Sequence, residues 1–340
     1  ESVKQVALEM VEEAGVELHL HSLIVGVTQQ GSRVLGVVTE SKSGRRAYLA
    51  QRVIDATGDG DVCVMAGATY AQGRKEDGVT QGLTVRFRIG YIHFERYFGW
   101  IAENRQYYHN ISDERLARVR ARALAGKDFF LNADLNELYE QLDPEGELPR
   151  GSYFNCSSIR PGELSLNATR ANYLDGTREE DLTRAEVACR KQAHALFHFL
   201  RAHVPGFEDA RLIETASQVG VRETRCIQGD YVITEADCRA GRTFEDAVLA
   251  SKVTFDMHDP DGYVLDTVRA VVDLPYRCLL PKGIDHTLVV GRCISSDHRA
   301  NSSLRQMVNA FQLGIVGGTA AALSVREGVP PRELPYAVLK

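Results

Sequence analysis

The chain has 340 residues, of which 44% are hydrophobic and 25% are charged, and its formal net charge is −6 at pH 7. This length is enough for a substantial core in one large domain or two interleaved domains. The acidic balance leaves no basic surface for nucleic acid. The most apolar stretch, residues 313–325, is shorter than the ~20 residues that a membrane-spanning helix needs. We therefore expect neither nucleic acid nor a membrane as a partner.

The seven cysteines are scattered along the chain and none of them forms a CxxC pair. A disulfide framework is therefore not expected, and a reducing, cytoplasmic location is predicted. The same scatter argues against an iron–sulfur cluster held by cysteines of this chain. The chain begins with Glu1, and residues 3–14 already have the spacing of a helix inside a domain. We therefore expect a fragment of a longer protein.

The first part of the chain predicts a helix followed by three strands. Turn residues between the strands predict an antiparallel meander. The predicted elements are a helix at residues 3–14, strands at residues 16–27, 33–40 and 46–56, and a short helix at residues 61–68.

From about residue 73 the composition becomes more charged, and a new region begins. Capping boxes at residues 183–186 and 234–237 predict two helix starts, and residues 259–262 have the residue order of a type I turn. The other predicted elements are strands at residues 84–89 and 288–290, a strand-rich stretch at residues 210–233, and helices at residues 112–125, 134–142 and 304–325.

The two glycine-containing junctions of the chain lie near its ends, at residues 57–61 and at residue 291. Both follow a strand and precede a helix, so we assign them to one domain. We predict that residues 1–75 and 281–340 form this domain, and that residues 76–280 are a substrate or cap region inserted between its halves.

The loop at residues 57–61 resembles part of a dinucleotide fingerprint, because it carries two glycines one residue apart. A phosphate cradle there would make the protein an NAD-dependent dehydrogenase. However, Cys63 stands at the third glycine position, and Asp59 and Asp61 place negative charge where a pyrophosphate needs free N–H groups. The loop is either a secondary wall, in which Asp59 accepts a hydrogen bond from a nucleotide, or an ordinary helix start with acids near its positive end.

The second junction ends at Gly291 and Arg292, and a loop of Ser and Asn separates it from a helix that begins near Leu304. Free N–H groups at a helix start stabilise negative charge on a reduced flavin ring. Small residues such as Gly314 give this helix a thin face, which serves a cofactor or close packing equally well. No GxGxxG heads a βαβ unit, so we expect the pyrophosphate-binding unit upstream of residue 1. The two junctions are expected to face a common slot for an extended nucleotide.

Four charged or titratable residues are candidates for substrate binding or proton transfer. Arg222 and Arg225 lie in a predicted strand and could bind an anionic substrate bidentately, or form a surface ion-pair ladder. His258 and His298 lie near the loops of the expected site, and histidine suits acid–base catalysis at neutral pH. For either histidine taken alone, a hydrogen-bonded structural role is the better explanation.

No metal site is predicted. His194 and His198 have the i, i+4 spacing of a helical zinc site. The second position is Ala195 rather than the Glu of hydrolytic zinc enzymes, and no third ligand is evident. A partly exposed amphipathic helix explains this pair better.

A series of motifs resembles the family of FAD-dependent oxidoreductases, which are similar to the flavin subunit of heterodisulfide reductase and to fumarate-reductase-type flavoproteins. The motifs occur in the same order over nearly the whole chain. They are residues 53–61, 220–225, 229–231, 256–258, 275–279 and 291–295, then Arg305 and the helix at residues 313–323.

The resemblance implies roles for particular residues. By that resemblance Thr57, Gly58 and Asp59 would lie on one side of FAD. Gly291 and Arg292 would lie on the other side. It also places Arg305 against the isoalloxazine ring and Gly314 in the helix beside the flavin. In this helix residues 314–317 replace the Gly-Gln-Ala-Ala-Gly run that is usual in the family. Some relatives carry iron–sulfur clusters, so a cluster is implied by the resemblance alone.

The predicted fold is α/β: an FAD-binding, doubly wound sheet of the two-dinucleotide-binding type that lacks its first βαβ unit, with an inserted α+β substrate region. The predicted function is FAD-dependent transfer of a hydride or electron pair to or from a small polar substrate, with an unknown electron acceptor. An alternative is a catalytically silent fragment or accessory subunit without its own flavin, and a second alternative is an NAD-dependent dehydrogenase. The candidate catalytic residues are Arg222, Arg225, His258, His298 and Arg305.

Overall fold

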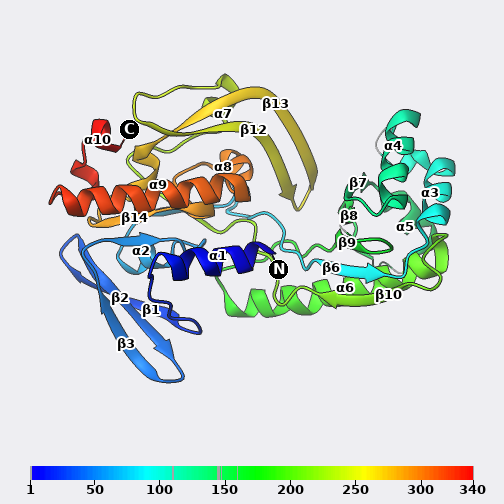
Figure 1. Cartoon of the computed structure of the whole chain (residues 1–340), viewed down its shortest axis with the longest axis horizontal. Helices are drawn as coiled ribbons and strands as arrows, with labels where there is room; N and C mark the ends of the chain where they lie inside the picture. Colours follow the sequence, from blue (N-terminus) through cyan, green and yellow to red (C-terminus); the bar gives the residue numbers. More distant parts are fainter. Residues whose placement is uncertain (1, 109–110, 144–145, 147, 159, 340) are drawn as a thin grey trace.

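The computed structural model describes residues 2–108, 111–143, 146, 148–158 and 160–339. Figure 1 shows two lobes, one of which carries both ends of the chain. In this first lobe β4 (Val53–Asp55) pairs in parallel with β14 (Thr287–Val289), so segments far apart in the sequence lie side by side. The predicted α/β class is confirmed, because helices and several separate sheets make up both lobes.

The remaining strands belong to four further sheets. They are β1 (Leu23–Gln30), β2 (Arg33–Ser41), β3 (Gly44–Leu49), β5 (Tyr70–Gln72), β6 (Phe87–Gly90), β7 (Phe129–Ala133), β8 (Phe154–Ser158), β9 (Leu164–Asn167), β10 (Arg211–Thr215), β11 (Arg225–Ile227), β12 (Ala247–Asp259) and β13 (Gly262–Pro275).

The helices vary in length from short turns to the long helices α6 and α9. They are α1 (Ser2–Glu13), α2 (Asp61–Met65), α3 (Phe94–Glu103), α4 (Asp113–Leu124), α5 (Asn136–Leu142), α6 (Glu179–His203), α7 (Glu235–Ala240), α8 (His298–Leu304), α9 (Met307–Arg326) and α10 (Tyr336–Leu339), with 3-10 helices η1 (Arg105–Tyr107), η2 (Tyr276–Leu279), η3 (Gly291–Cys293) and η4 (Pro331–Glu333).

The predicted antiparallel meander is confirmed as the sheet β1-β2-β3. The single strand predicted at residues 46–56 is wrong, because the chain leaves this sheet between Leu49 and Val53. The second half becomes β4, whose first N–H donates to the carbonyl of His286 over 2.9 Å. The change of partner was invisible in the sequence because both halves are equally apolar.

The second lobe has its own hydrophobic core, which is built from residues between Phe87 and Ala210. Its five-stranded sheet has the order β10-β6-β9-β8-β7. Several aromatic side chains are almost fully buried in it, including Tyr97, Phe98 and Phe154. Burial of such rings is the main stabilising term for a lobe of this size. We call this part the cap lobe.

A long antiparallel hairpin, β12–β13, was not predicted from the sequence. Its strands pair from Ala247 with Pro275 to Asp259 with Gly262, and the predicted turn at residues 259–262 joins them. The hairpin packs with α8 and α9 in one hydrophobic cluster that runs from Ile233 to Leu334. The division of the chain at residues 75 and 280 stays a prediction.

One of the two helix starts predicted from capping boxes differs from the structure. The capping box at residues 183–186 lies inside α6, which begins one turn earlier at Glu179 with three acidic residues in its first turn. Acids at that position interact favourably with the helix dipole. The capping box at residues 234–237 is confirmed at the start of α7.

The helix predicted at residues 304–325 is confirmed as α9, which begins three residues later than predicted, and a separate short helix precedes it. The Ser- and Asn-containing segment expected to be a loop forms α8, which Asp297 caps by accepting a 2.7 Å hydrogen bond from the N–H of Ala300. Gln306 then adopts an extended conformation, and α9 begins at Met307.

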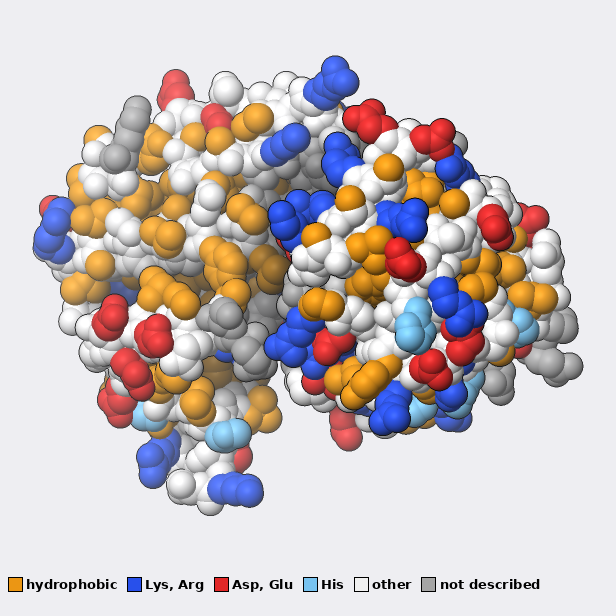
Figure 2. Space-filling view, turned by 45° about the vertical axis from the view of Figure 1, so that its right-hand side comes forward, with side chains coloured by type: hydrophobic (Ala, Val, Ile, Leu, Met, Phe, Trp, Pro, Cys, Tyr) orange, Lys and Arg blue, Asp and Glu red, His pale blue; other side chains and the backbone are white. Residues whose placement is uncertain are grey.

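By length and composition α9 could cross a membrane. Leu313 and Ala320 on its inner face are fully buried. The added Cβ of a larger residue at Gly317 would lie only 2.7 Å from Val290, so α9 packs closely against the end of β14. Its other face is exposed and apolar, and Figure 2 shows hydrophobic side chains spread over the lobe that carries it. The expectation that no membrane is a partner stays a prediction.

Candidate functional site

The loop after β4 is organised by Asp55, whose side chain is fully buried. One carboxylate oxygen accepts hydrogen bonds from the N–H and the hydroxyl of Thr57, at 3.1 and 2.7 Å. The other accepts from the N–H of Cys63 over 2.9 Å. The Thr57 hydroxyl in turn accepts from the N–H of Asp61. The polar groups of this loop therefore bond to one another and fix the entry to α2.

The two glycine-containing junctions lie next to each other, but no slot separates them. The Asp59 carboxylate accepts a 2.7 Å hydrogen bond from Arg292 and a 2.6 Å hydrogen bond from the Thr224 hydroxyl. The guanidinium of Arg292 covers Gly58, where an added Cβ would lie 2.9 Å from its Cζ. The predicted common slot is therefore filled by a side chain, and Asp59 is already occupied. This geometry by itself gives no support for a nucleotide between residues 57–61 and Arg292.

The region around the start of α9 is open. An added Cβ at Gly291, Gly314 or Gly318 would meet no atom within 4 Å. The side chain of Gln306 does not cap α9, and among the described residues no side chain accepts from the first N–H groups of this helix. The exposed apolar side chains beside it are Met307, Val308, Phe311 and Ile315. This surface combines free backbone donors with a thin, apolar helix face.

Three arginines meet in a cluster between the hairpin and the cap lobe. The guanidinium of Arg222 is buried, and it donates to the carbonyl of Gly82 and to Asn167. Arg170 donates to the carbonyl of Gly151 over 2.6 Å and to the ring of His258 over 3.1 Å. Among the described residues, neither Arg222 nor Arg170 has a carboxylate within hydrogen-bond distance. Burial, and then the positive charges of Arg305 and Arg170, lower the pKa of Arg222 to about 9.

Asp256 lies between Arg305 and His258. Arg305 donates to the Asp256 carbonyl over 2.7 Å, and its Nη2 lies 3.4 Å from the carboxylate. The carboxylate is also 3.2 Å from Nε2 of His258 and accepts a hydrogen bond from the Tyr263 hydroxyl. Burial and the nearby Arg222 lower the pKa of His258 to about 3, against the opposing effect of Asp256. His258 is therefore neutral, and the network assigns Nε2–H as donor to Asp256 and Nδ1 as acceptor from Arg170.

His298 has the opposite charge state. Its Nδ1 lies 2.7 Å from the buried Glu223 carboxylate, and its Nε2 lies 3.1 Å from Asp259. Burial lowers the pKa of His298, but the hydrogen bonds and charges of Asp259 and Glu223 outweigh it and raise the pKa to about 9. His298 is therefore protonated at neutral pH, with both ring N–H groups donated to carboxylates.

The structure brings together four of the five candidate catalytic residues. His258, His298 and Arg305 share one hydrogen-bond network through Asp256, Glu223 and Gln81, whose Oε1 accepts from the N–H of His258 and from Arg305. Arg222 lies beside this network, within electrostatic range of Arg305 and Asp256. Figure 2 shows Lys and Arg side chains gathered along the furrow between the two lobes. Arg225 lies outside this network and pairs with Asp61. The alternative that Arg222 belongs to a surface ion-pair ladder is wrong, because its side chain is buried.

Sequence reasoning missed Arg170, Gln81 and Tyr263, and it placed Asp256 in a motif without giving it a role. Nothing in the sequence singles out Gln81 or Arg170, since each is a lone polar residue and its role depends on a neighbour more than 80 positions away. Asp256 and Tyr263 carried a signal that could have been used. Both flank the predicted turn at residues 259–262, and in a hairpin such residues come close together.

Comparison with known proteins places this chain in a family. A family model described as "FAD dependent oxidoreductase" matches residues 1–340. A search of curated proteins finds no match.

Several solved structures are similar to the chain at low identity. They include the myxobacterial chondrochloren halogenase CndH (13% identity, TM-score 0.47, 99% of this chain and 53% of that one), the flavin-dependent brominase Bmp2 (12%, 0.46, 99% and 58%) and a geranylgeranyl bacteriochlorophyll reductase-like protein from Thermoplasma acidophilum (11%, 0.44, 96% and 54%).

The chain spans a little over half the length of these solved structures. The finer resemblance to the flavin subunit of heterodisulfide reductase and to fumarate-reductase-type flavoproteins stays a prediction. The match of the family model over the whole length shows that this chain belongs to the FAD dependent oxidoreductase family.

Proposed function

We propose that the protein transfers a hydride or electron pair between FAD and a small anionic substrate, and that the arginine cluster binds the anion. The observation that carries this proposal is the buried guanidinium of Arg222, which has only neutral acceptors. In and beside the described network, four cationic groups, Arg170, Arg222, Arg305 and protonated His298, face three carboxylates, Glu223, Asp256 and Asp259. A buried charge without a partner costs several kcal/mol, and a bound anion would offset that cost.

The start of α9 is the part of this chain that fits the cofactor. Uncapped N–H groups, open space beside Gly291 and Gly314, and an apolar helix face are what a flavin ring needs from a protein. Buried polar atoms without a hydrogen-bond partner also occur nearby, namely Nε2 of Gln81 and Nε of Arg305. The loop at residues 57–61 does not fit as a nucleotide wall, because Arg292 covers it. A GxGxxG unit upstream of residue 1 stays a prediction.

When bound, FAD supplies the hydride or electron-pair chemistry, and the residues of this chain position the substrate. Arg222 and Arg305 hold the anionic group, and Asp256 holds Arg305 in place. Both histidines use both ring nitrogens within the network. We therefore assign His258 and His298 to positioning these groups and not to direct proton transfer to the substrate.

The test is anaerobic reduction of the FAD-loaded protein by small carboxylates. The reaction is measured as the loss of oxidised-flavin absorbance. Arg222→Gln should raise the substrate KM by at least about tenfold, as expected for loss of a charge-assisted contact. Arg269→Gln on the exposed side of β13 is the matched control and should leave KM unchanged. An unchanged KM in Arg222→Gln, in a protein that still binds FAD, would remove the arginine cluster from the site.

The silent-fragment alternative is favoured by one observation, the side chain of Arg292 in the predicted slot. It predicts that the chain binds neither FAD nor NAD. A fluorescence titration with each nucleotide, on the protein with any segment encoded upstream of residue 1 included, distinguishes the three functions. Tight FAD binding supports the oxidoreductase, NAD binding without FAD binding supports the dehydrogenase, and no binding of either nucleotide supports the silent fragment. The cytoplasmic location and the electron acceptor stay predictions.

A further inference from the structure

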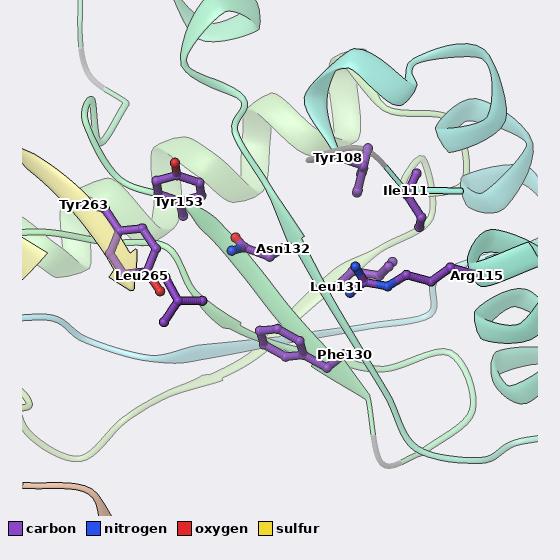
Figure 3. Close-up of a pocket in the computed structure, with 9 residues that line it drawn as sticks. All are labelled: Tyr108, Ile111, Arg115, Phe130, Leu131, Asn132, Tyr153, Tyr263 and Leu265. Carbon is purple, nitrogen blue, oxygen red and sulfur yellow. The ribbon is translucent and has the colours of Figure 1, made fainter. Parts of the chain in front are cut away.

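A cavity of about 360 Å³ lies between the cap lobe and the hairpin, away from the start of α9. Its walls come from α4, β7 and β13, with Tyr153 closing one side (Figure 3). This volume falls within the roughly 300–1,000 Å³ of small-molecule sites. The cavity is separate from the arginine cluster, and no role described so far uses it.

The walls of the cavity are largely aromatic and apolar. Tyr153 and Tyr263 lie with their ring centroids 4.5 Å apart. Phe130 from β7 and Leu265 from β13 also line the space, and their side chains are 53% and 54% exposed. Both side chains remain half exposed around the cavity, so the apolar surface that they bury on folding adds little to stability. A flat apolar ligand between them would bury both.

Two polar groups at the cavity, Oδ1 of Asn132 and the guanidinium of Arg115, have no hydrogen-bond or ion-pair partner among the described residues. Oδ1 of Asn132 is buried, whereas Arg115 is exposed. Figure 3 shows the Asn132 amide directed toward Tyr153 and Tyr263 across the cavity. Arg115 reaches the cavity from α4, and among the described residues no carboxylate pairs with its guanidinium. An unpaired guanidinium beside aromatic walls favours a planar anion, because it binds carboxylates bidentately.

We propose that this cavity binds an aromatic carboxylate. The ring lies among Phe130, Leu265 and the two tyrosines, and the carboxylate pairs with Arg115. The Asn132 amide provides a further polar contact, such as one to a ring hydroxyl.

The site is one side chain away from the arginine cluster. The ring centroid of Tyr263 is 4.7 Å from that of His258, and its hydroxyl hydrogen-bonds to Asp256. Occupancy of the cavity would therefore be sensed at Asp256 and Arg305. The binding itself needs no flavin, so this inference goes beyond the proposed function and does not depend on it.

The test uses the chain without added flavin and measures binding by isothermal titration calorimetry. The probes are benzoate, 4-hydroxybenzoate and, as the uncharged counterpart, benzyl alcohol. Benzoate should bind saturably and benzyl alcohol at least about tenfold more weakly, because it lacks the charge that Arg115 recognises. The ring centroid of Trp100, the single tryptophan, lies 6.2 Å from that of Tyr108 at the cavity wall. The fluorescence of Trp100 should therefore change on binding.

Matched variants separate this site from nonspecific binding. Arg115→Gln should weaken benzoate binding by about tenfold or more, whereas Arg118→Gln, on the same helix but outside the cavity, should not. Leu265→Glu should abolish binding, because it places a carboxylate at the cavity. Val264→Glu is its control, since successive strand residues point to opposite faces and Val264 is 50% exposed.

Two outcomes would overturn the proposal. One is the absence of saturable heat with benzoate and 4-hydroxybenzoate. The other is benzoate binding that Arg115→Gln and Leu265→Glu leave unchanged. Neither outcome affects the proposed function, because that function is tested by flavin reduction at the arginine cluster.

Discussion

Replacing Arg222 by Met should stabilise the protein in the absence of an anion. A mutation of a buried charged residue usually destabilises, because it breaks an ion pair. Arg222 is different because its guanidinium donates only to the carbonyl of Gly82 and to Asn167, with two further arginines nearby. Its removal relieves an unbalanced charge, and methionine fills much of the same volume.

The magnitude follows from the lowered pKa of Arg222. Burial and the two neighbouring arginines lower this pKa from 12.5 to about 9. Each pKa unit corresponds to about 1.4 kcal/mol, so the charged form costs the folded state roughly 5 kcal/mol. This cost is fully present below about pH 9 and disappears only above 12.5, where the unfolded chain is also neutral. Loss of the two hydrogen bonds removes about 1 kcal/mol each, which leaves a net gain on the order of 1–3 kcal/mol.

The assay is urea unfolding at neutral pH, with Arg305→Met as the contrasting variant. Arg305 pairs with the half-buried Asp256 carboxylate, so its loss removes one partner of that carboxylate and should cost about 1–3 kcal/mol. A saturating anion should stabilise the wild type by about 2.7 kcal/mol at one hundred times its Kd and should leave Arg222→Met unchanged. If Arg222→Met is destabilised as strongly as Arg305→Met, Arg222 has a counter-charge and the reasoning is refuted.

Three further predictions concern single residues. His298→Gln should remove a pH dependence of stability, which urea unfolding at several pH values measures. The pKa of His298 in the folded protein is raised from 6.5 to about 9. Its contribution to stability, up to about 3 kcal/mol, is therefore complete below pH 6.5 and is lost as pH rises through 9. Asp55→Asn should cost about 1–3 kcal/mol in the same assay, since an amide N–H replaces one of the acceptors for Thr57 and Cys63; no loss would show that the loop is held elsewhere. Gly58→Ala should lower the free energy of unfolding by at least about 1 kcal/mol, because φ at residue 58 is 82° and the new Cβ would lie 2.9 Å from Arg292. A variant as stable as the wild type would mean that Arg292 moves freely.

Much of the fold could be predicted because local signals agreed with the final structure. The β1–β3 meander, the helix α4 with its Ser112 cap and the capping box of α7 are determined by turn residues and caps within a few positions. Errors arose where a local sequence signal was overridden by another part of the structure. The box at residues 183–186 lost to three acids one turn earlier, and the strand at residues 46–56 divided because its second half pairs with β14.

The candidate site was predicted in part for the same reason. Motifs pointed to Arg222, His258, His298 and Arg305, and the structure brings them together. What the sequence could not provide was their state of charge. One histidine is neutral and the other protonated, because His258 lies among arginines and His298 between two carboxylates. Such differences arise from residues brought together by the fold, and no spacing in the chain encodes them.

The filled slot and the open helix face together narrow where a cofactor can lie on this chain. A nucleotide between residues 57–61 and Arg292 would have to break the 2.7 Å hydrogen bond between Arg292 and Asp59, a half-buried ion pair. A flavin ring against the start of α9 breaks no such contact and covers apolar side chains that are now exposed, such as Met307 and Phe311. We therefore propose the second position, which lies close in sequence to Arg305, the partner of Asp256. In this arrangement FAD binding, which the family membership implies, does not require a nucleotide between residues 57–61 and Arg292. The cofactor and an anion bound at the arginine cluster would then meet at the junction of α8 and α9.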